Sequence, residues 1–249
     1  MSAFALIACV LIGMVSGFLN VLAAGGSFLT LPLLLFLGLP ASIANGTNRV
    51  GVLAQNIGGV WGFHRHDVIE WRWALSVSII AVMGAAIGAW AALGISDFAF
   101  RRSLSILMLA VTLLTLMLRR LPGAAAGRPR RSPLHWTMIT GFFIVGLYGG
   151  FIQAGVGFLI LAMTAIAGMD LVRGNAVKVL TVMLLTWVSL AIFAGTGNVN
   201  WPLGLALGAG NLAGASMGVR FAVLRGHRWL ERVVVAAVSV FAVLLWMTE

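Results

Sequence analysis

The chain has 249 residues, of which 61% are hydrophobic and 9% are charged, and its mean hydropathy is +1.07. This composition excludes an ordinary soluble protein and predicts an all-α polytopic membrane protein. The formal net charge is +10, but the basic residues gather in a few loops, which is typical of the positive-inside rule and not of nucleic-acid binding. The single cysteine, Cys9, excludes an intramolecular disulfide and a cysteine-based zinc site.

Long stretches of the chain contain no Asp, Glu, Lys or Arg. A bilayer core needs about 20 apolar residues per helix, so several of these stretches hold one span and the longest hold two. They are residues 1–48, 73–96, 103–118, 132–169, 179–219 and 233–248.

The first apolar stretch is interrupted at residues 22–34, LAAGGSFLTLPLL, by a Gly-Gly-Ser sequence and then by Pro32. Irregular backbone at membrane depth is tolerated only where protein or a watery cavity covers it. We therefore predict a helix hairpin over residues 1–38, and a second one over 134–170 with its turn at GGFIQAGVGF, residues 149–158. Two such hairpins meeting near the midplane would bring both glycine turns around one pseudo-two-fold axis.

The second half of the chain repeats the first. Placing Gly155 on Gly25 aligns the two halves without a gap, and we call this displacement the repeat offset. Repeats of this kind are the usual ground plan of secondary transporters. The other matched residues include Phe28 with Phe158, Asn45 with Asn175, Trp71 with Trp201, Gly84 with Gly214, and Gly88 with Gly218.

We predict two transmembrane repeats, 1–118 and 134–249, joined by a basic linker, 119–133. Each repeat is expected to be a glycine-broken helix hairpin plus three transmembrane helices. The two are expected to form an inverted repeat.

The distribution of arginine predicts the topology. The linker 119–133 contains five arginines, so we place it in the cytoplasm. The basic segments 64–72 and 219–232 are expected on the same side, which leaves both termini outside. Arg101 and Arg102 then also lie outside, and this is a cost of the arrangement.

Each half places a cation inside an apolar helix. The segments ANGTNRV and GNAVKVL begin with Asn45 and Asn175, interpreted as N-caps, and Arg49 and Lys178 follow about one turn later. A cation at this depth costs about 2.5–3.5 kcal/mol on insertion scales, and every acidic residue lies in a loop or at a span end. Snorkelling is one explanation; our interpretation is that both cations point inward and pair with a bound anion.

The glycine turns have two possible roles. Glycine lets a ligand approach the backbone, and the free amides at a helix start favour an anion; the alternative is close helix packing through small residues. We predict an anion site from both turns and both helix starts. Its residues are Gly25, Gly26, Ser27, Asn45, Thr47, Asn48, Arg49, Gln153, Gly155, Gly157, Asn175 and Lys178.

These segments also carry a family resemblance. GGSFLTLPLLLFLGLP, ANGTNRV and the repeated GVGFLILAMTAIAGMDLVRGNAVKVL resemble the TauE/SafE family of membrane permeases, the sulfite exporter group, and the resemblance covers nearly the whole chain. It implies transport of sulfite, sulfonates or related organosulfur anions across the bacterial cytoplasmic (inner) membrane. Ala162 stands where the first half has Pro32, so the two halves of the site are expected to be non-equivalent.

The expected function is a secondary transporter for a small sulfur-containing anion, without catalytic residues, bound metal or cofactor. Its expected partners are that anion and the lipid bilayer, with no nucleic acid, and a homodimer is left open. The alternatives are a membrane-embedded enzyme acting on a lipid-soluble substrate and a non-transporting assembly partner. An enzyme needs a nucleophile or an acid–base pair, and the spans contain no carboxylate. An assembly partner has no need of two broken hairpins with inward cations.

The predicted topology puts residues 119–133 inside and both termini outside. A cysteine introduced at position 125 and another at the C-terminus are therefore expected to react with an impermeant thiol reagent from opposite sides of the membrane. Labelling of both from the same side contradicts the inverted arrangement.

Overall fold

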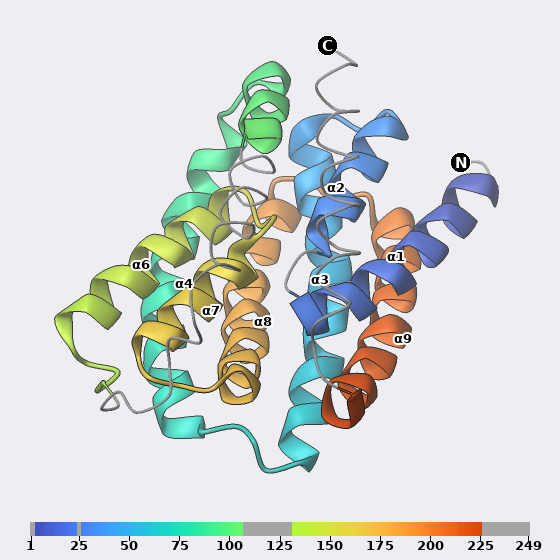
Figure 1. Ribbon diagram of the computed structural model, residues 1–249. Coiled ribbons are helices and arrows are strands. Elements are labelled where there is room, and N and C mark those ends of the chain that lie inside the picture. Colours follow the sequence, from blue (N-terminus) through green and yellow to red (C-terminus); the bar gives the residue numbers. More distant parts are fainter. Residues whose placement is uncertain (1–2, 24–25, 107–130, 226–249) are drawn as a thin grey trace.

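The computed structural model describes residues 3–23, 26–106 and 131–225 (Figure 1). These ranges contain helices and short connections and no β-strand, which confirms the all-α prediction for this part of the chain. Residues 119–130 of the predicted linker lie outside the described ranges. Most of the last helix predicted for each half also lies outside them. Residues 97–106 are helical. The other helices are α1 (Ala3–Ala23), α2 (Ser27–Phe36), α3 (Ala41–Arg65), α4 (Trp71–Leu93), α6 (Trp136–Phe151), α7 (Val156–Ile166), α8 (Leu171–Gly195) and α9 (Trp201–Arg225).

Both predicted hairpins are broken where the glycines stand. In the first, α1 is followed by the 10-residue α2; in the second, α6 is followed by the 11-residue α7. Helices this short do not cross a bilayer core, which needs about 20 residues. Each short helix ends near a glycine in the left-handed region, Gly38 at φ +86° and Gly168 at φ +81°, where residues with a Cβ are strained.

Helix boundaries recur at the repeat offset. Helices α3 and α8 both have 25 residues and begin and end at aligned positions, and α4 and α9 each begin with a tryptophan, Trp71 and Trp201. The positive-φ positions recur as well, because Asp67 (φ +51°) and Gly197 (φ +75°) are also aligned positions of the two halves. Similar breaks in the two halves therefore produce similar helices.

The halves exchange partners when they pack. Helix α1 packs along α9, and α6 packs along α4, so each half covers the fourth helix of the other (Figure 1). Helices α3 and α8 pack against each other, against α9 and α4 respectively, and against the short helices α2 and α7. Both hairpins are thereby held against α3 and α8.

Glycines allow these exchanged contacts to be close. A Cβ added to Gly84 of α4 would lie 2.2 Å from the carbonyl oxygen of Phe143 in α6, and one added to Gly214 of α9 would lie 1.9 Å from that of Met14 in α1. Only glycine fits at such distances. Gly84 and Gly214 therefore have a packing role.

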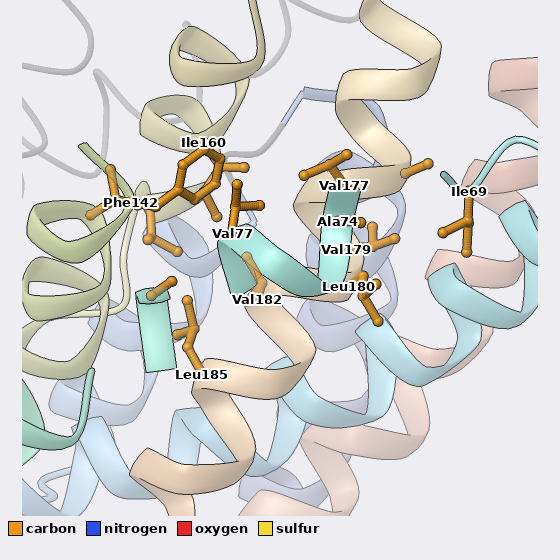
Figure 2. Close-up of a cluster of buried hydrophobic side chains, with 14 of the residues drawn as sticks. Ile69, Ala74, Val77, Phe142, Ile160, Val177, Val179, Leu180, Val182 and Leu185 are labelled. Carbon is orange, nitrogen blue, oxygen red and sulfur yellow. The ribbon is translucent and has the colours of Figure 1, made fainter. Parts of the chain in front are cut away.

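Apolar side chains fill the space between α4, α6, α7 and α8. Figure 2 shows this cluster, in which Val77, Phe142, Ile160 and Leu185 come from the four different helices and are fully buried. Within the described ranges, α1, α4 and α8 are long and apolar enough to cross a membrane. The core thus supports α8, one of the two helices that carry the buried cations.

The contact at Gly214 leads to a test with a matched control. Gly214→Ala is expected to destabilise the protein by about 1–3 kcal/mol, because the added methyl group pushes α9 away from α1. Gly195→Ala adds the same methyl group where no atom lies within 4 Å and is expected to leave the melting temperature in detergent unchanged. Equal melting temperatures for the two variants would contradict the close α1–α9 contact.

Candidate functional site

The starts of the two short helices lie side by side. The rings of Phe28 in α2 and Phe158 in α7 stack with their centroids 6.5 Å apart, and these two residues are aligned positions of the two halves. Gly155, the N-cap of α7, has φ +75°, and a Cβ there would lie 2.6 Å from Cζ of Phe28. The prediction that the two turns meet is therefore confirmed for the described residues.

A small polar cavity lies where the turns meet. Its free volume is about 10 Å³, which is room for about one water molecule. Both short helices begin at this cavity, so the partial positive charges of their N-termini are directed at it. Five of the predicted site residues line it, and five others join them; the lining residues are Asn20, Ser27, Val52, Asn56, Gln153, Gly155, Val156, Gly157, Lys178 and Val182.

Lys178 is the cation at this cavity. Its side chain is 2% exposed, and Nζ donates hydrogen bonds to the carbonyl oxygens of Asn20 (2.8 Å) and Val21 (3.4 Å) and to Oδ1 of Asn175 (2.7 Å). Helix α1 ends at Ala23, so the ammonium group caps the C-terminal end of α1. Carbonyls at a helix end lack partners in the helix, and the helix dipole favours a cation there.

Arg49 caps the C-terminal end of a helix in the second hairpin. Its guanidinium is fully buried and donates to the carbonyl oxygens of Gly149 (Nη1, 3.2 Å) and Gly150 (Nη2, 2.5 Å), at the C-terminal end of α6. Nη2 also lies 3.4 Å from Oδ1 of Asn45, and Cζ lies 4.7 Å from the ring centroid of Phe193. Arg49 does not line the cavity.

The expectation that the two cations lack protein partners is therefore wrong. The sequence contains no acidic residue in the spans to neutralise them, and this led us to assign the role of partner to an anion alone. Backbone carbonyls supply partners instead, and they come from the opposite half of the chain. Each cation, from α3 or α8, holds the end of the other half's first helix.

The N-cap roles predicted for Asn45 and Asn175 are also wrong. Helix α3 already begins at Ala41, after Pro40, and α8 begins after Asp170, whose Oδ1 accepts hydrogen bonds from the amides of Val172 and Arg173. The two asparagines lie one turn inside their helices. There Asn175 accepts from Lys178, and Asn45 donates from Nδ2 to the carbonyl oxygen of Phe151 (2.8 Å).

The other predicted residues of the first half bind protein atoms. Oδ1 of Asn48 accepts from the hydroxyl of Thr30 (2.5 Å), and Oγ1 of Thr47 accepts from the amide of Asn200 (2.9 Å). Gly26 packs against α1, where a Cβ would lie 2.3 Å from the carbonyl oxygen of Ser16. Gly25 lies outside the described residues.

Two amide side chains at the cavity were not predicted as site residues. Asn20 lies on α1, and Asn56 lies two turns after Arg49 on α3, with Nδ2 donating to the carbonyl oxygen of Val52 (2.7 Å). For Asn20 the signal available in the sequence was an asparagine in a largely apolar helix; α3 contains several other polar residues, so Asn56 had no comparable signal. Within the described ranges, no group of three or more His, Cys, Asp or Glu side chains is placed to hold a metal ion.

The cavity has donors suited to an anion. Its described lining includes one cation and no carboxylate. Gln153 is 1% exposed, its Nε2 donates to the hydroxyl of Thr186, and its Oε1 has no hydrogen-bond partner. A buried amide oxygen without a partner is costly, and as an acceptor Oε1 needs a hydrogen-bond donor.

The contact between the two turns leads to a second matched pair. Gly155→Ala and Gly38→Ala both place a Cβ at positive φ, which costs roughly 1–2 kcal/mol, but only the alanine at 155 meets Phe28, since nothing lies within 4 Å of a Cβ at 38. We expect both variants to lose stability in detergent and the loss to be larger for Gly155→Ala. Equal loss in the two melting temperatures would contradict tight packing of the turns.

Comparison with known proteins identifies the family of the chain. The family model described as "Sulfite exporter TauE/SafE" matches residues 9–245. A "Probable membrane transporter protein" of Haemophilus influenzae is 28% identical over 225 residues, covering 90% of this chain and 88% of the relative. The "Probable membrane transporter protein YfcA" of Escherichia coli K12 is 26% identical over 232 residues, covering 93% and 86%.

A further relative, "Probable membrane transporter protein ORF9" of a Sinorhizobium species, is 25% identical over 232 residues, covering 93% of this chain and 88% of the relative. No solved structure matches the chain. The family model covers nearly all of the chain, and these relatives, named as membrane transporters, match it along most of their length. The chain therefore belongs to the sulfite exporter TauE/SafE family of membrane transporters.

Proposed function

We propose that this protein is a secondary transporter that moves a small sulfur-containing oxyanion, such as sulfite or an organosulfonate, across the bacterial cytoplasmic membrane. The observation that carries the proposal is the cavity between the two broken hairpins, with Lys178 as its charged group. Sulfite and sulfonates are hydrogen-bond acceptors with negative charge. The ammonium group, the amides and the helix N-termini around the cavity are donors or positive dipole ends.

We further propose that the two halves form an inverted repeat around this site. The recurrence of helix bounds at the repeat offset and the exchanged packing of α1 on α9 and α6 on α4 support a pseudo-two-fold relation. In secondary transporters, discontinuous helices from such repeats bind substrate near the midplane, and the repeats rock against each other. The meeting of Phe28 with Phe158 supports an axis between the two turns.

The cavity with room for about one water molecule corresponds to a closed state in this proposal. An oxyanion enters when the two turns separate, and the Phe28–Phe158 contact is then lost. The anion binds at the starts of α2 and α7, where it meets amide groups and Lys178. The two alternatives to transport, catalysis and assembly, gain no support from a described feature of this site.

The driving force is expected to be the membrane potential. A cell interior is negative, so an anion moving outward gains roughly 2.3 kcal/mol per charge per 100 mV. We expect proteoliposomes to transport sulfite, sulfoacetate, thiosulfate or sulfate at a rate that rises with an imposed potential, whereas any flux of taurine, a zwitterion without net charge at neutral pH, is not expected to respond to it. The potential and the pH gradient are clamped separately, and protein-free liposomes serve as the control.

Two results of this experiment would contradict the proposal in different ways. Flux that follows the proton gradient and ignores the potential contradicts uncoupled export. Absence of flux for every anion of the panel, with protein that is folded in the liposomes, contradicts transport of sulfur-containing anions.

A further inference from the structure

The two buried cations share a helix-capping role but differ in what surrounds them. We propose that Lys178 alone binds the transported anion and that it releases the end of α1 when it does so, whereas Arg49 stays on the end of α6 as a fixed tie. This inference rests on the proposed transport function. It assigns different roles to two residues for which the sequence predicts the same role.

Access is the first difference. Lys178 lines the cavity together with Gln153 and the turn residues Ser27 and Gly157. Arg49 is 0% exposed and is enclosed by Asn45, by two carbonyls of α6 and by the Phe193 ring. An anion in the cavity is therefore within reach of the ammonium group and separated from the guanidinium by protein.

The chemistry of the two side chains is the second difference. A guanidinium is a planar fork, and Arg49 uses two of its nitrogens on the consecutive carbonyls of Gly149 and Gly150. Such a two-point contact stacked on an aromatic ring holds one geometry. An ammonium group is a compact charge on a flexible stem with three rotatable donors. Lys178 can change partners without moving its helix.

Competition for the ammonium hydrogens links the anion to α1. Lys178 already has three acceptors, the carbonyl oxygens of Asn20 and Val21 and Oδ1 of Asn175. It has three hydrogens to donate, so an anion must displace at least one of these acceptors. Asn20 lines the cavity, whereas Val21 and Asn175 do not, so we take the bond to the Asn20 carbonyl as the one that the anion displaces. Losing it leaves the end of α1 with only the longer bond from Nζ to the carbonyl oxygen of Val21.

The end of α1 is in contact with the turn that closes the cavity. A Cβ on Gly26 would lie 2.3 Å from the carbonyl oxygen of Ser16 and 2.7 Å from Cβ of Asn20. At this distance a shift of the α1 end displaces Gly26, and Ser27 follows it at the cavity wall. Release of α1 by Lys178 thus widens a space that is too small for an oxyanion in the closed state.

Gln153 can supply a second, neutral donor at this place. Its Oε1 is buried and unpaired while its Nε2 contacts the Thr186 hydroxyl. A half-turn of the amide lets Oε1 accept from that hydroxyl and directs the two amide hydrogens to the cavity. Gln153 is then a neutral donor beside the charge of Lys178, and an acceptor-rich anion satisfies both.

The experiment measures anion-dependent thermal stabilisation and flux for the same variants of the full-length protein. The melting temperature in detergent is recorded against sodium sulfite and, separately, sodium methanesulfonate, with sodium chloride keeping the ionic strength constant. The variants are Lys178→Gln, Lys178→Arg, Arg49→Gln and Arg49→Lys. Arg72→Gln removes an exposed cation at the start of α4 and serves as the charge control.

A ligand that binds only the folded protein raises its melting temperature. Lys178→Gln is expected to shift the anion midpoint about tenfold or more to higher concentration, as for loss of a charge-assisted hydrogen bond. Arg49→Gln is expected to lower the melting temperature without anion but to keep the wild-type midpoint. Arg72→Gln is expected to behave as wild type in both respects.

Lys178→Arg separates binding from release and also decides the case if Lys178→Gln does not fold. The arginine keeps the positive charge, so stabilisation by the anion is expected to remain. Its guanidinium group is expected to stay on the α1 carbonyls and to lower the flux about tenfold or more. A tenfold loss corresponds to an added barrier of about 1.4 kcal/mol. Arg49→Lys is expected to retain the wild-type midpoint. Wild-type flux in Lys178→Arg overturns the release step.

The remaining outcomes separate this inference from the proposed function. If the wild-type protein transports the anion, but the anion midpoint shifts in Arg49→Gln and not in Lys178→Gln, the division of roles is overturned and the transport proposal stands. If the wild-type protein shows no flux and no stabilisation with any anion, both this inference and the proposed function are overturned.

Discussion

The structure depends on how the ends of broken helices are satisfied away from water. A helix that stops inside an apolar region exposes carbonyl groups with no partner in the helix, and lipid offers none. Here Lys178 and Arg49 supply the missing donors for α1 and α6. Because each cation comes from the opposite half, the same bonds that satisfy the helix ends also join the halves around the cavity.

This arrangement balances two costs. A buried cation without a partner and a helix end without a cap are each unfavourable in a low-dielectric interior. When they are placed together, the partial negative charge of the helix end offsets the desolvation of the cation. The positive charge that remains is not matched by any carboxylate in the described part of the cavity lining, which supports the proposed binding of an anion there. The electrostatics that hold the fold are thus also those that the proposed function uses.

Much of the architecture was predictable because glycine and lipid impose local rules. The need for glycine at positions 26 and 155 can be read from short segments, although it arises from close packing against α1 at Gly26 and from a positive φ at Gly155. The repeat offset follows from recurring Gly, Trp and Phe. The partners of Arg49 and Lys178 were not predictable, since they are carbonyls far away along the chain and carbonyls have no sequence signature. The start of α8 was misplaced for a different reason: two residues suited to an N-cap, Asp170 and Asn175, lie about one turn apart, and Asp170 is the one that caps the helix.

The exchanged packing has a consequence for how the chain assembles during synthesis. Gly13 and Gly17 of α1 are made first, yet the backbone they fit against, at Leu207 and Asn211 of α9, is made near the end. Domains normally fold as units as they emerge from the ribosome, but among the described helices the main partner of each half's first helix belongs to the other half. The first half must wait in the membrane, with its closest-fitting surface uncovered, until the second half has been inserted. Halves made as separate polypeptides would therefore be expected to reach the native arrangement only by meeting each other.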